Sequence, residues 1–96
     1  MGIDEVIRAN QDVIRRIVEQ HGARNVRVFG SVARGEAGPE SDIDLLVEAG
    51  PSTSAWFPGG LVADLEDLLG RRVDIVTERG LVPELRERVL REAIPV

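Results

Sequence analysis

The sequence predicts a small α/β domain in which helices cover a short β-sheet. The chain has 96 residues, which is the length of one domain. Segments with apolar residues at helical spacing alternate with short runs rich in β-branched residues, in the order α-β-α-β-α-β-α. No internal repeat or low-complexity segment divides the chain, so we expect a single domain over residues 1–96.

The first half of the chain contains two predicted helices and one predicted strand. Apolar residues recur every three or four positions over 3–21 and acidic residues occupy the first turn, which predicts one long amphipathic helix. Residues 25–29 predict a strand that runs into Gly30. A short helix is expected over 31–34, and the Gly-Pro pair within 36–40 predicts a loop.

The second half contains two further strands and two further helices. The run Ser-Asp-Ile-Asp-Leu-Leu-Val predicts a strand over 41–47, and the prolines and glycines of 50–60 predict an irregular connection. Leucines at helical spacing predict a helix over 61–69, which the glycine that follows would end. We expect a third strand over 71–77. A last helix is expected over 83–94, because proline is tolerated in a first helical turn.

The composition excludes several classes of protein. The net charge is −5 and all 12 basic residues are arginines, so the chain lacks the basic face that nucleic acid or an anionic membrane requires. Without lysine or cysteine there is no Walker-type phosphate site, zinc-thiolate site or thiol nucleophile, and one histidine excludes a multi-histidine metal site. No apolar run approaches the roughly 20 residues of a membrane span, and no secretion signal is present, so we expect a cytoplasmic protein.

Three aspartates stand inside predicted strands. Asp42 and Asp44 are two residues apart, so their side chains share one face of the strand with Cα atoms about 6.5–7 Å apart. Aspartate is depleted in strands, and adjacent carboxylates repel unless a cation lies between them. Hard oxygen donors favour Mg²⁺ or Mn²⁺. If the strand that carries Asp74 is a neighbour, three carboxylates could converge as a two-metal site requires.

These aspartates also have ordinary interpretations. Asp42 and Asp44 could belong to a strand whose solvated face is acidic, and Asp74 could pair with Arg71 or Arg72 on the surface.

A glycine and a serine stand at the predicted turn from strand to helix. Gly30 would let a phosphate approach the backbone, and the following amides and the Ser31 hydroxyl could donate to it, although Gly-Ser is also common in plain turns. Arg34 could pair with a phosphate or with Glu36.

Structural roles are expected for three other residues. His21, at the end of the first helix, is expected to interact with the helix dipole and not to act as a catalyst. Trp56 and Phe57 are expected to pack onto the core, or else to form a patch for a partner or a stacked base.

The motif Gly30-Ser31, ten intervening residues and then Asp42-Ile43-Asp44 resembles the signature of the nucleotidyltransferase superfamily that includes DNA polymerase β. The string from Gly30 to Val47 resembles the minimal nucleotidyltransferases (MNT proteins) of prokaryotes, and Asp74 matches the position of that family's third carboxylate. The resemblance covers about residues 26–77. It implies a polymerase β-like catalytic core, with a small mixed β-sheet flanked by helices.

The resemblance also implies roles for individual residues. Asp42 and Asp44 would ligate two Mg²⁺ ions, and Asp74 would complete the site of the ion that activates the attacking hydroxyl and could accept its proton. Gly30 and Ser31 would hold the β- and γ-phosphates of a nucleoside triphosphate, here ATP. Two cations would stabilise the charge that develops on the attacking and leaving oxygens.

Arg34 matches the string Gly-Ser-x-Ala-Arg-Gly of the family, which implies a nucleotide-binding role. Characterised MNT proteins transfer AMP from ATP to a tyrosine of a HEPN-domain ribonuclease toxin and thereby silence it. By resemblance the chain is an antitoxin of this kind, with a HEPN-domain toxin as its partner. It lacks the domains that bind base and acceptor in larger relatives, so a homo-oligomer or the partner would complete the acceptor site.

Other functions stay open at this stage. The chain could be an antitoxin that masks its toxin by binding alone, the catalytic subunit of a small-molecule nucleotidyltransferase, or a plain structural α/β domain.

Overall fold

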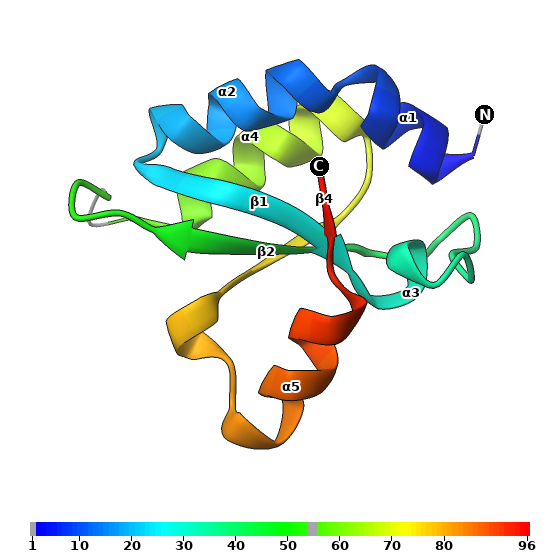
Figure 1. The fold of residues 1–96 in the computed structure, drawn as a ribbon. Helices are drawn as coiled ribbons and strands as arrows, with labels where there is room; N and C mark the ends of the chain where they lie inside the picture. The colour runs from blue at the N-terminus through cyan, green and yellow to red at the C-terminus, as the bar shows by residue number, and fades with distance from the viewer. Residues whose placement is uncertain (1, 54–55) are drawn as a thin grey trace.

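A mixed β-sheet forms the centre of the molecule (Figure 1). The computed structural model describes residues 2–53 and 56–96, so Ser54 and Ala55 of the predicted irregular connection lie outside the described residues. The strands of the described chain are β1 (Ala23–Phe29), β2 (Ile43–Ala49), β3 (Val73–Thr77) and β4 (Ile94–Pro95). Their order across the sheet is β3-β2-β1-β4, in which β1 runs antiparallel to β2 and β4 whereas β2 and β3 are parallel. The α/β class and the mixed sheet are thus confirmed.

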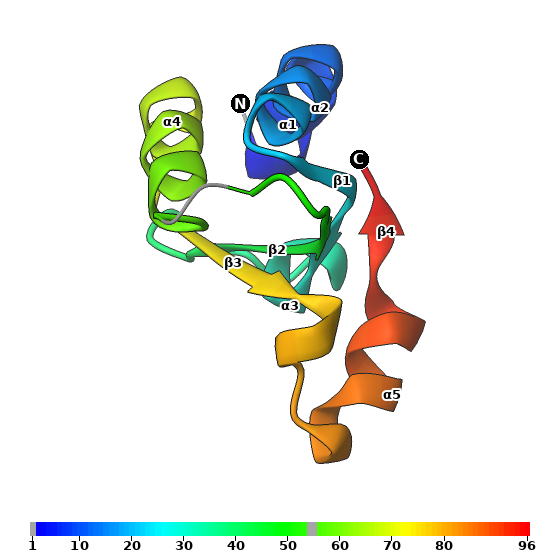
Figure 2. The same cartoon turned by 90° about the vertical axis from the view of Figure 1, so that its left-hand side faces the viewer.

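Helices lie on both faces of this sheet, as Figure 2 shows. The helices α1, α2 and α4 cover one face, and α5 lies on the other. The short helix α3 follows β1 directly, and the 3-10 helix η1 follows β3. Their bounds are α1 (Ile3–Ala9), α2 (Gln11–Gln20), α3 (Gly30–Ala33), α4 (Gly59–Leu69), η1 (Glu78–Gly80) and α5 (Pro83–Glu92).

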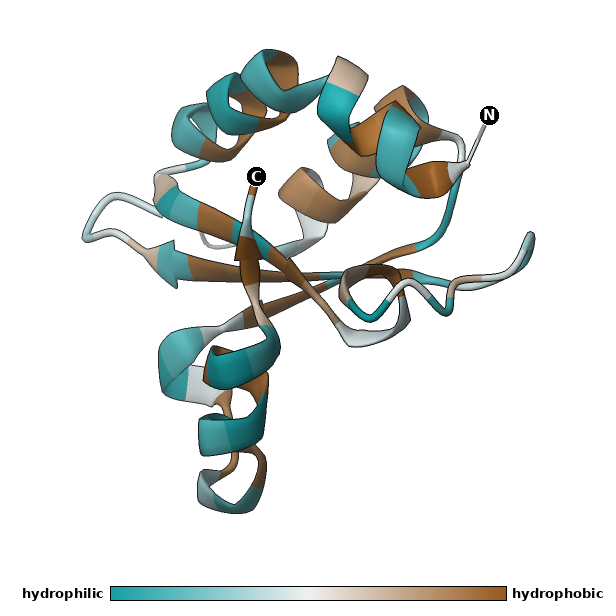
Figure 3. Cartoon of the chain, turned by 45° about the vertical axis from the view of Figure 1, so that its right-hand side comes forward, coloured by the Kyte–Doolittle hydropathy of each residue, from teal (hydrophilic) through white to brown (hydrophobic). Residues whose placement is uncertain are grey.

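The main core lies between the sheet and the layer of α1, α2 and α4. Ile43, Leu45 and Val47 of β2 are fully buried there, together with leucines of α4 and aliphatic residues of α2. Apolar stretches of these helices turn toward the sheet, while hydrophilic stretches face outward (Figure 3). Because side chains alternate along a strand, Asp44 and Leu46 point to the opposite face, where α5 packs.

The predicted helix over 3–21 is broken in two at Asn10. The Asn10 backbone leaves the helical region, with φ −114° and ψ 15°, and its side-chain amide donates to the Val6 carbonyl at 2.7 Å. Asparagine favours such local side-chain bonds, which compete with the helix. The prediction of one continuous helix was therefore wrong at this residue.

The last helix ends at Glu92, before the predicted position 94. Ile94 instead pairs with Val28 as part of β4. The residue before a proline is driven out of the α region by a clash with the proline ring, and Ile94 precedes Pro95. This strand is not among the elements predicted from the sequence. Among the described residues, no helix has the length and apolar character needed to cross a membrane.

Candidate active site

Two of the three predicted aspartates lie directly opposite each other. Asp44 of β2 and Asp74 of β3 are register partners on parallel strands, so their side chains project from the same face of the sheet. Asp44 is half-buried, whereas Asp74 is exposed on a strand at the edge of the sheet. The expectation that the strands carrying these residues are neighbours is confirmed.

The third aspartate, Asp42, immediately precedes β2 and is not part of the strand. Its Oδ1 atom lies 3.8 Å from Nε of Arg72, whose side chain is 85% exposed. The carboxylate of Asp42 is near enough to Asp44 to repel it. One ordinary interpretation of Asp74 had paired it with Arg71 or Arg72. In the structure Arg72 pairs with Asp42 instead.

Arg71 supports the loop that leads into Asp42. Its Nη2 atom donates to the carbonyl of Gly38 at 2.8 Å and to that of Ser41 at 2.7 Å. The Ser41 hydroxyl in turn accepts from the Gly38 N–H at 2.8 Å. Arg71 therefore fixes the backbone just before the aspartate motif, a role that sequence reasoning did not assign to it.

The carboxyl group of Asp44 carries unfavourable negative charge. Burial raises its pKa above the ordinary aspartate value, and the charges of Asp74 and Asp42 raise the pKa further. The charge of Arg34 opposes this effect, and that of Glu92 adds to it. The site has an excess of negative charge that a bound cation would relieve.

Gly30 brings the turn between β1 and α3 against Asp44. Its φ is +73°, a left-handed conformation that favours glycine, and a Cβ atom placed on it would clash with Oδ2 of Asp44. Phe29, the residue before, is the register partner of Asp44. The predicted strand-to-helix turn is confirmed: α3 begins at Gly30, and Ser31 is its second residue.

A carboxylate that the sequence analysis did not single out, Glu92, closes this turn. Its Oε2 atom accepts from the Gly30 N–H at 2.9 Å, and its Oε1 atom accepts from Nη1 of Arg34 at 2.8 Å. Arg34 also donates from Nε to Glu36 at 2.8 Å, so the predicted pairing with Glu36 is present. Glu92 is 62 residues from Gly30 in the chain, and no local motif marks it.

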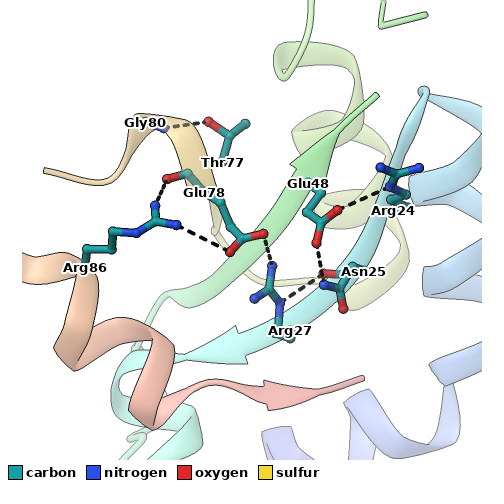
Figure 4. A network of polar contacts seen from close by, with 8 residues as sticks. All are labelled: Arg24, Asn25, Arg27, Glu48, Thr77, Glu78, Gly80 and Arg86. Carbon is teal, nitrogen blue, oxygen red and sulfur yellow. Dashed lines mark hydrogen bonds and ion pairs between the residues drawn. The ribbon is translucent and has the colours of Figure 1, made fainter. Parts of the chain in front are cut away.

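The helix that carries Glu92 is fastened to the sheet by a network of polar contacts (Figure 4). Glu78 of η1 lies 3.3 Å from Nη2 of Arg27 on β1, and its backbone carbonyl accepts from Nη1 of Arg86 on α5 at 2.8 Å. Beside them, Glu48 of β2 accepts from the Asn25 side chain at 2.8 Å. Together with β4 at the other end, this network fixes the position of α5.

The three aspartates fit a divalent metal ion by the chemistry of their donor atoms. Among residues 2–53 and 56–96, no three acidic or histidine side chains enclose a metal site in the observed conformation. The hard oxygens and the mutual repulsion at Asp44 nevertheless suit Mg²⁺. The metal assignment therefore stays a prediction.

The remaining candidates have structural positions. His21 is the C-cap of α2, and its Nε2 lies 2.7 Å from Oδ2 of Asp64 on α4. Phe57 packs against the core, whereas Trp56 is 84% exposed. Of the two alternatives for this aromatic pair, core packing holds for Phe57 alone.

Known proteins resemble this chain along most of its length. The family model described as nucleotidyltransferase domain matches residues 11–96. A protein of Methanocaldococcus jannaschii, provisionally named protein adenylyltransferase, is 40% identical over 96 residues, which are 100% of this chain and 99% of the relative. Protein adenylyltransferase MntA of Thermococcus cleftensis is 38% identical over 94 residues, which are 98% of this chain and 92% of the relative.

Solved structures share the fold. A structure described provisionally as a minimal nucleotidyltransferase superposes on this chain with a TM-score of 0.88 at 53% sequence identity. The superposition covers 100% of this chain and 97% of the other chain. A toxin–antitoxin crystal structure with AMP-PNP gives a TM-score of 0.76 at 24% identity, over 90% of this chain and 71% of its own, and this likeness shows the fold alone.

Proposed function

We propose that this chain transfers AMP from ATP to a hydroxyl group of a HEPN-type toxin. The chain belongs to the nucleotidyltransferase domain family and is a nucleotidyltransferase. The observation that carries the proposal is the position of Asp44. It lies opposite Asp74 on one side and against the glycine turn on the other. Metal-binding carboxylates and phosphate-binding amides would then lie next to each other, as nucleotidyl transfer requires.

Asp42, Asp44 and Asp74 are the residues that would hold Mg²⁺. With Mg²⁺ bound, the site would stabilise negative charge on the attacking and leaving oxygens. The Gly30 N–H and the Ser31 hydroxyl would bind the β- and γ-phosphates and so orient the triphosphate toward the carboxylates. The net acidity of the chain does not oppose this assignment, because the cations supply the positive charge.

Asp74 is the residue best placed to receive the proton of the attacking hydroxyl. It is exposed on β3, at the edge of the sheet, whereas Asp44 beside it is half-buried. An acceptor hydroxyl can therefore approach from the β3 side. A tyrosine on a separate protein would reach this edge without entering a cavity.

The names of two relatives support a protein as the acceptor, since both are named protein adenylyltransferase. The resemblance of the motif to MNT proteins adds the identity of the partner, a HEPN-domain toxin. Silencing of that toxin would make this chain an antitoxin that acts catalytically, in the cytoplasm where both proteins are made.

A second candidate is an antitoxin that acts by binding alone. Exposed apolar side chains favour a docking role for this chain, namely Trp56, Val82 and Leu85, which are 84%, 51% and 48% exposed. Docking is also required for adenylylation, so these residues do not decide between the two functions.

The direct test is to incubate the purified chain with Mg²⁺, ATP labelled at the α-phosphate and the HEPN-domain protein of the same genome. We expect the label to appear on the HEPN-domain protein, together with a mass increase of one or more AMP groups. An unchanged partner mass under conditions in which the two proteins form a complex would overturn the proposal.

A further inference from the structure

We propose that Glu92 is an internal ligand of the phosphate-binding turn, and that ATP displaces its carboxylate in order to bind. The inference rests on the proposed function, because it assumes that Gly30 and Arg34 bind the triphosphate. It goes further by assigning a role to a residue outside the nucleotidyltransferase motif.

The contacts of Glu92 are those that a phosphate group would make at the same place. One carboxylate oxygen accepts from the backbone N–H of Gly30 at 2.9 Å, and the other accepts from Nη1 of Arg34 at 2.8 Å. A phosphate binds through the same combination of backbone amide and guanidinium. The Gly30 amide has a single N–H, so carboxylate and phosphate compete for it.

Glu92 is held in a charged, partly buried position. Its side chain is 16% exposed, and the hydrogen bond from Arg34 lowers the pKa of its carboxyl below the ordinary glutamate value. The anion is also near enough to Asp44 to raise the pKa of that group. Glu92 therefore adds negative charge to the space that an anionic triphosphate has to enter.

The backbone of Glu92 is fixed, so its displacement requires a rotation of the side chain. Two residues further on, Ile94 pairs with Val28 of the sheet. At the other end of α5, Arg86 donates to the Glu78 carbonyl at 2.8 Å. The helix is thus attached on both sides, whereas the side chain of Glu92 can leave Gly30 and Arg34 by rotation about its own bonds.

Arg34 is prepared for the exchange. Its Nε atom stays bonded to Glu36 at 2.8 Å, which holds the guanidinium in place when Nη1 loses its partner. The released Nη1 and the Gly30 N–H would then both be available to the triphosphate. Glu36 contacts Arg34 and is not bonded to Gly30, so Glu92 is the residue that blocks both donors.

The test compares Glu92→Gln with Glu87→Gln by isothermal titration calorimetry with ATP and Mg²⁺, and with inorganic triphosphate. Both variants remove one negative charge from α5, but the Glu87 side chain is 87% exposed and pairs with Arg91. We expect Glu92→Gln to bind ATP about fivefold or more tightly than wild type, since an uncharged amide oxygen competes for the Gly30 N–H less strongly than a carboxylate does and does not repel the triphosphate. Glu87→Gln should bind like wild type.

A folded Glu92→Gln protein that binds ATP no more tightly than wild type would overturn the inference while leaving the proposed function intact. Absence of ATP and triphosphate binding in every protein would instead overturn both.

An independent measurement needs no variant at all. In wild type, nuclear magnetic resonance should show the Gly30 amide and the Glu92 side-chain carboxyl shifting together as inorganic triphosphate is added. A carboxyl signal that stays unchanged while the Gly30 amide shifts would show that Glu92 keeps its place, and the inference would fail.

Discussion

Asp44 and Asp74 stand opposite each other on the parallel strands β2 and β3, with no residue between them in the register of the sheet. Parallel neighbours place side chains of the same register on the same face. The sheet therefore keeps the two carboxylates close together although their negative charges repel each other. Their repulsion, added to the burial of Asp44, raises the pKa of the Asp44 carboxyl.

The first prediction concerns the stability cost of Asp44. The pKa of Asp44 is higher in the folded protein than in the unfolded chain, where it is about 3.9. The protonated Asp44 therefore favours the folded state. This contribution to the free energy of unfolding is fully present below the unfolded pKa and is lost as pH rises through the folded pKa. At neutral pH the ionised carboxylate destabilises the protein without metal. Asp44→Asn should therefore melt at the same temperature as wild type or higher.

The advantage of Asp44→Asn should shrink as pH falls, since wild-type Asp44 then becomes neutral as well. Melting temperatures measured from about pH 7 down to about pH 4 would show this convergence. Asp67→Asn, on the exposed side of α4, is the control for loss of one negative charge. A large drop in melting temperature for Asp44→Asn alone would mean that Asp44 is a structural residue, contrary to the metal assignment.

The second prediction separates two effects of adding a methyl group at a left-handed glycine. Gly30 and Gly35 have φ values of +73° and +72°, so alanine at either position carries a similar conformational cost of about 1–2 kcal/mol. A Cβ at Gly35 meets no atom within 4 Å, whereas one at Gly30 clashes with Asp44. Gly30→Ala should therefore destabilise the protein more and also weaken ATP binding, with Gly35→Ala as the matched control. Equal ATP affinity in calorimetry for the two folded variants would argue against the turn as the phosphate site.

The fold was predictable where the local pattern decided it. Asp44 and Asp74 could be placed in strands because each interrupts a short apolar run, and Gly30 could be placed in a turn because it follows a strand. The register that makes Asp44 and Asp74 partners was not encoded in either segment alone. It depends on how β3 packs beside β2, which is a tertiary interaction.

The parts that sequence reasoning missed depend on contacts between distant residues. Glu92 is 62 residues from Gly30 in the chain, and Arg71 binds carbonyl groups that are 33 and 30 residues away. Neither residue belongs to a motif. The break at Asn10 was local, but asparagine within an otherwise periodic helix does not show by itself whether its side chain faces solvent or binds the backbone.

The third prediction concerns stabilisation by ligands. Binding to the native state alone stabilises it by about 2.7 kcal/mol at a ligand concentration 100-fold above Kd. For a domain of this size that corresponds to a rise in melting temperature on the order of 10 °C. Mg²⁺ with ATP should produce this rise in wild type, and chelation of Mg²⁺ with EDTA should remove most of it. A rise that is unchanged by EDTA would show that the metal is not needed for nucleotide binding.

The fourth prediction compares two adjacent arginines near Asp42. Arg71 donates to two backbone carbonyls of the loop, whereas Arg72 is exposed and its Nε lies 3.8 Å from Oδ1 of Asp42. Arg71→Gln should lower the free energy of unfolding by about 1–3 kcal/mol, because two carbonyl groups lose a charged donor. Arg72→Gln should change it by less than about 0.5 kcal/mol. Urea denaturation of the two variants measures both values, and equal losses would show that Arg71 does not fix the loop.

The last prediction separates catalysis from masking. A protein with both Asp42→Asn and Asp44→Asn retains Trp56 and the exposed face of α5, so it should still bind the HEPN-domain partner. It should transfer no AMP, because two of the three proposed metal ligands are lost. At doses well below one copy per toxin, wild type should silence the toxin and the double variant should not, since one catalyst modifies many molecules whereas a masking protein needs about one copy for each. If both proteins neutralise the toxin equally at equal dose, and wild type adds no mass to it, the chain is an antitoxin that acts by binding alone.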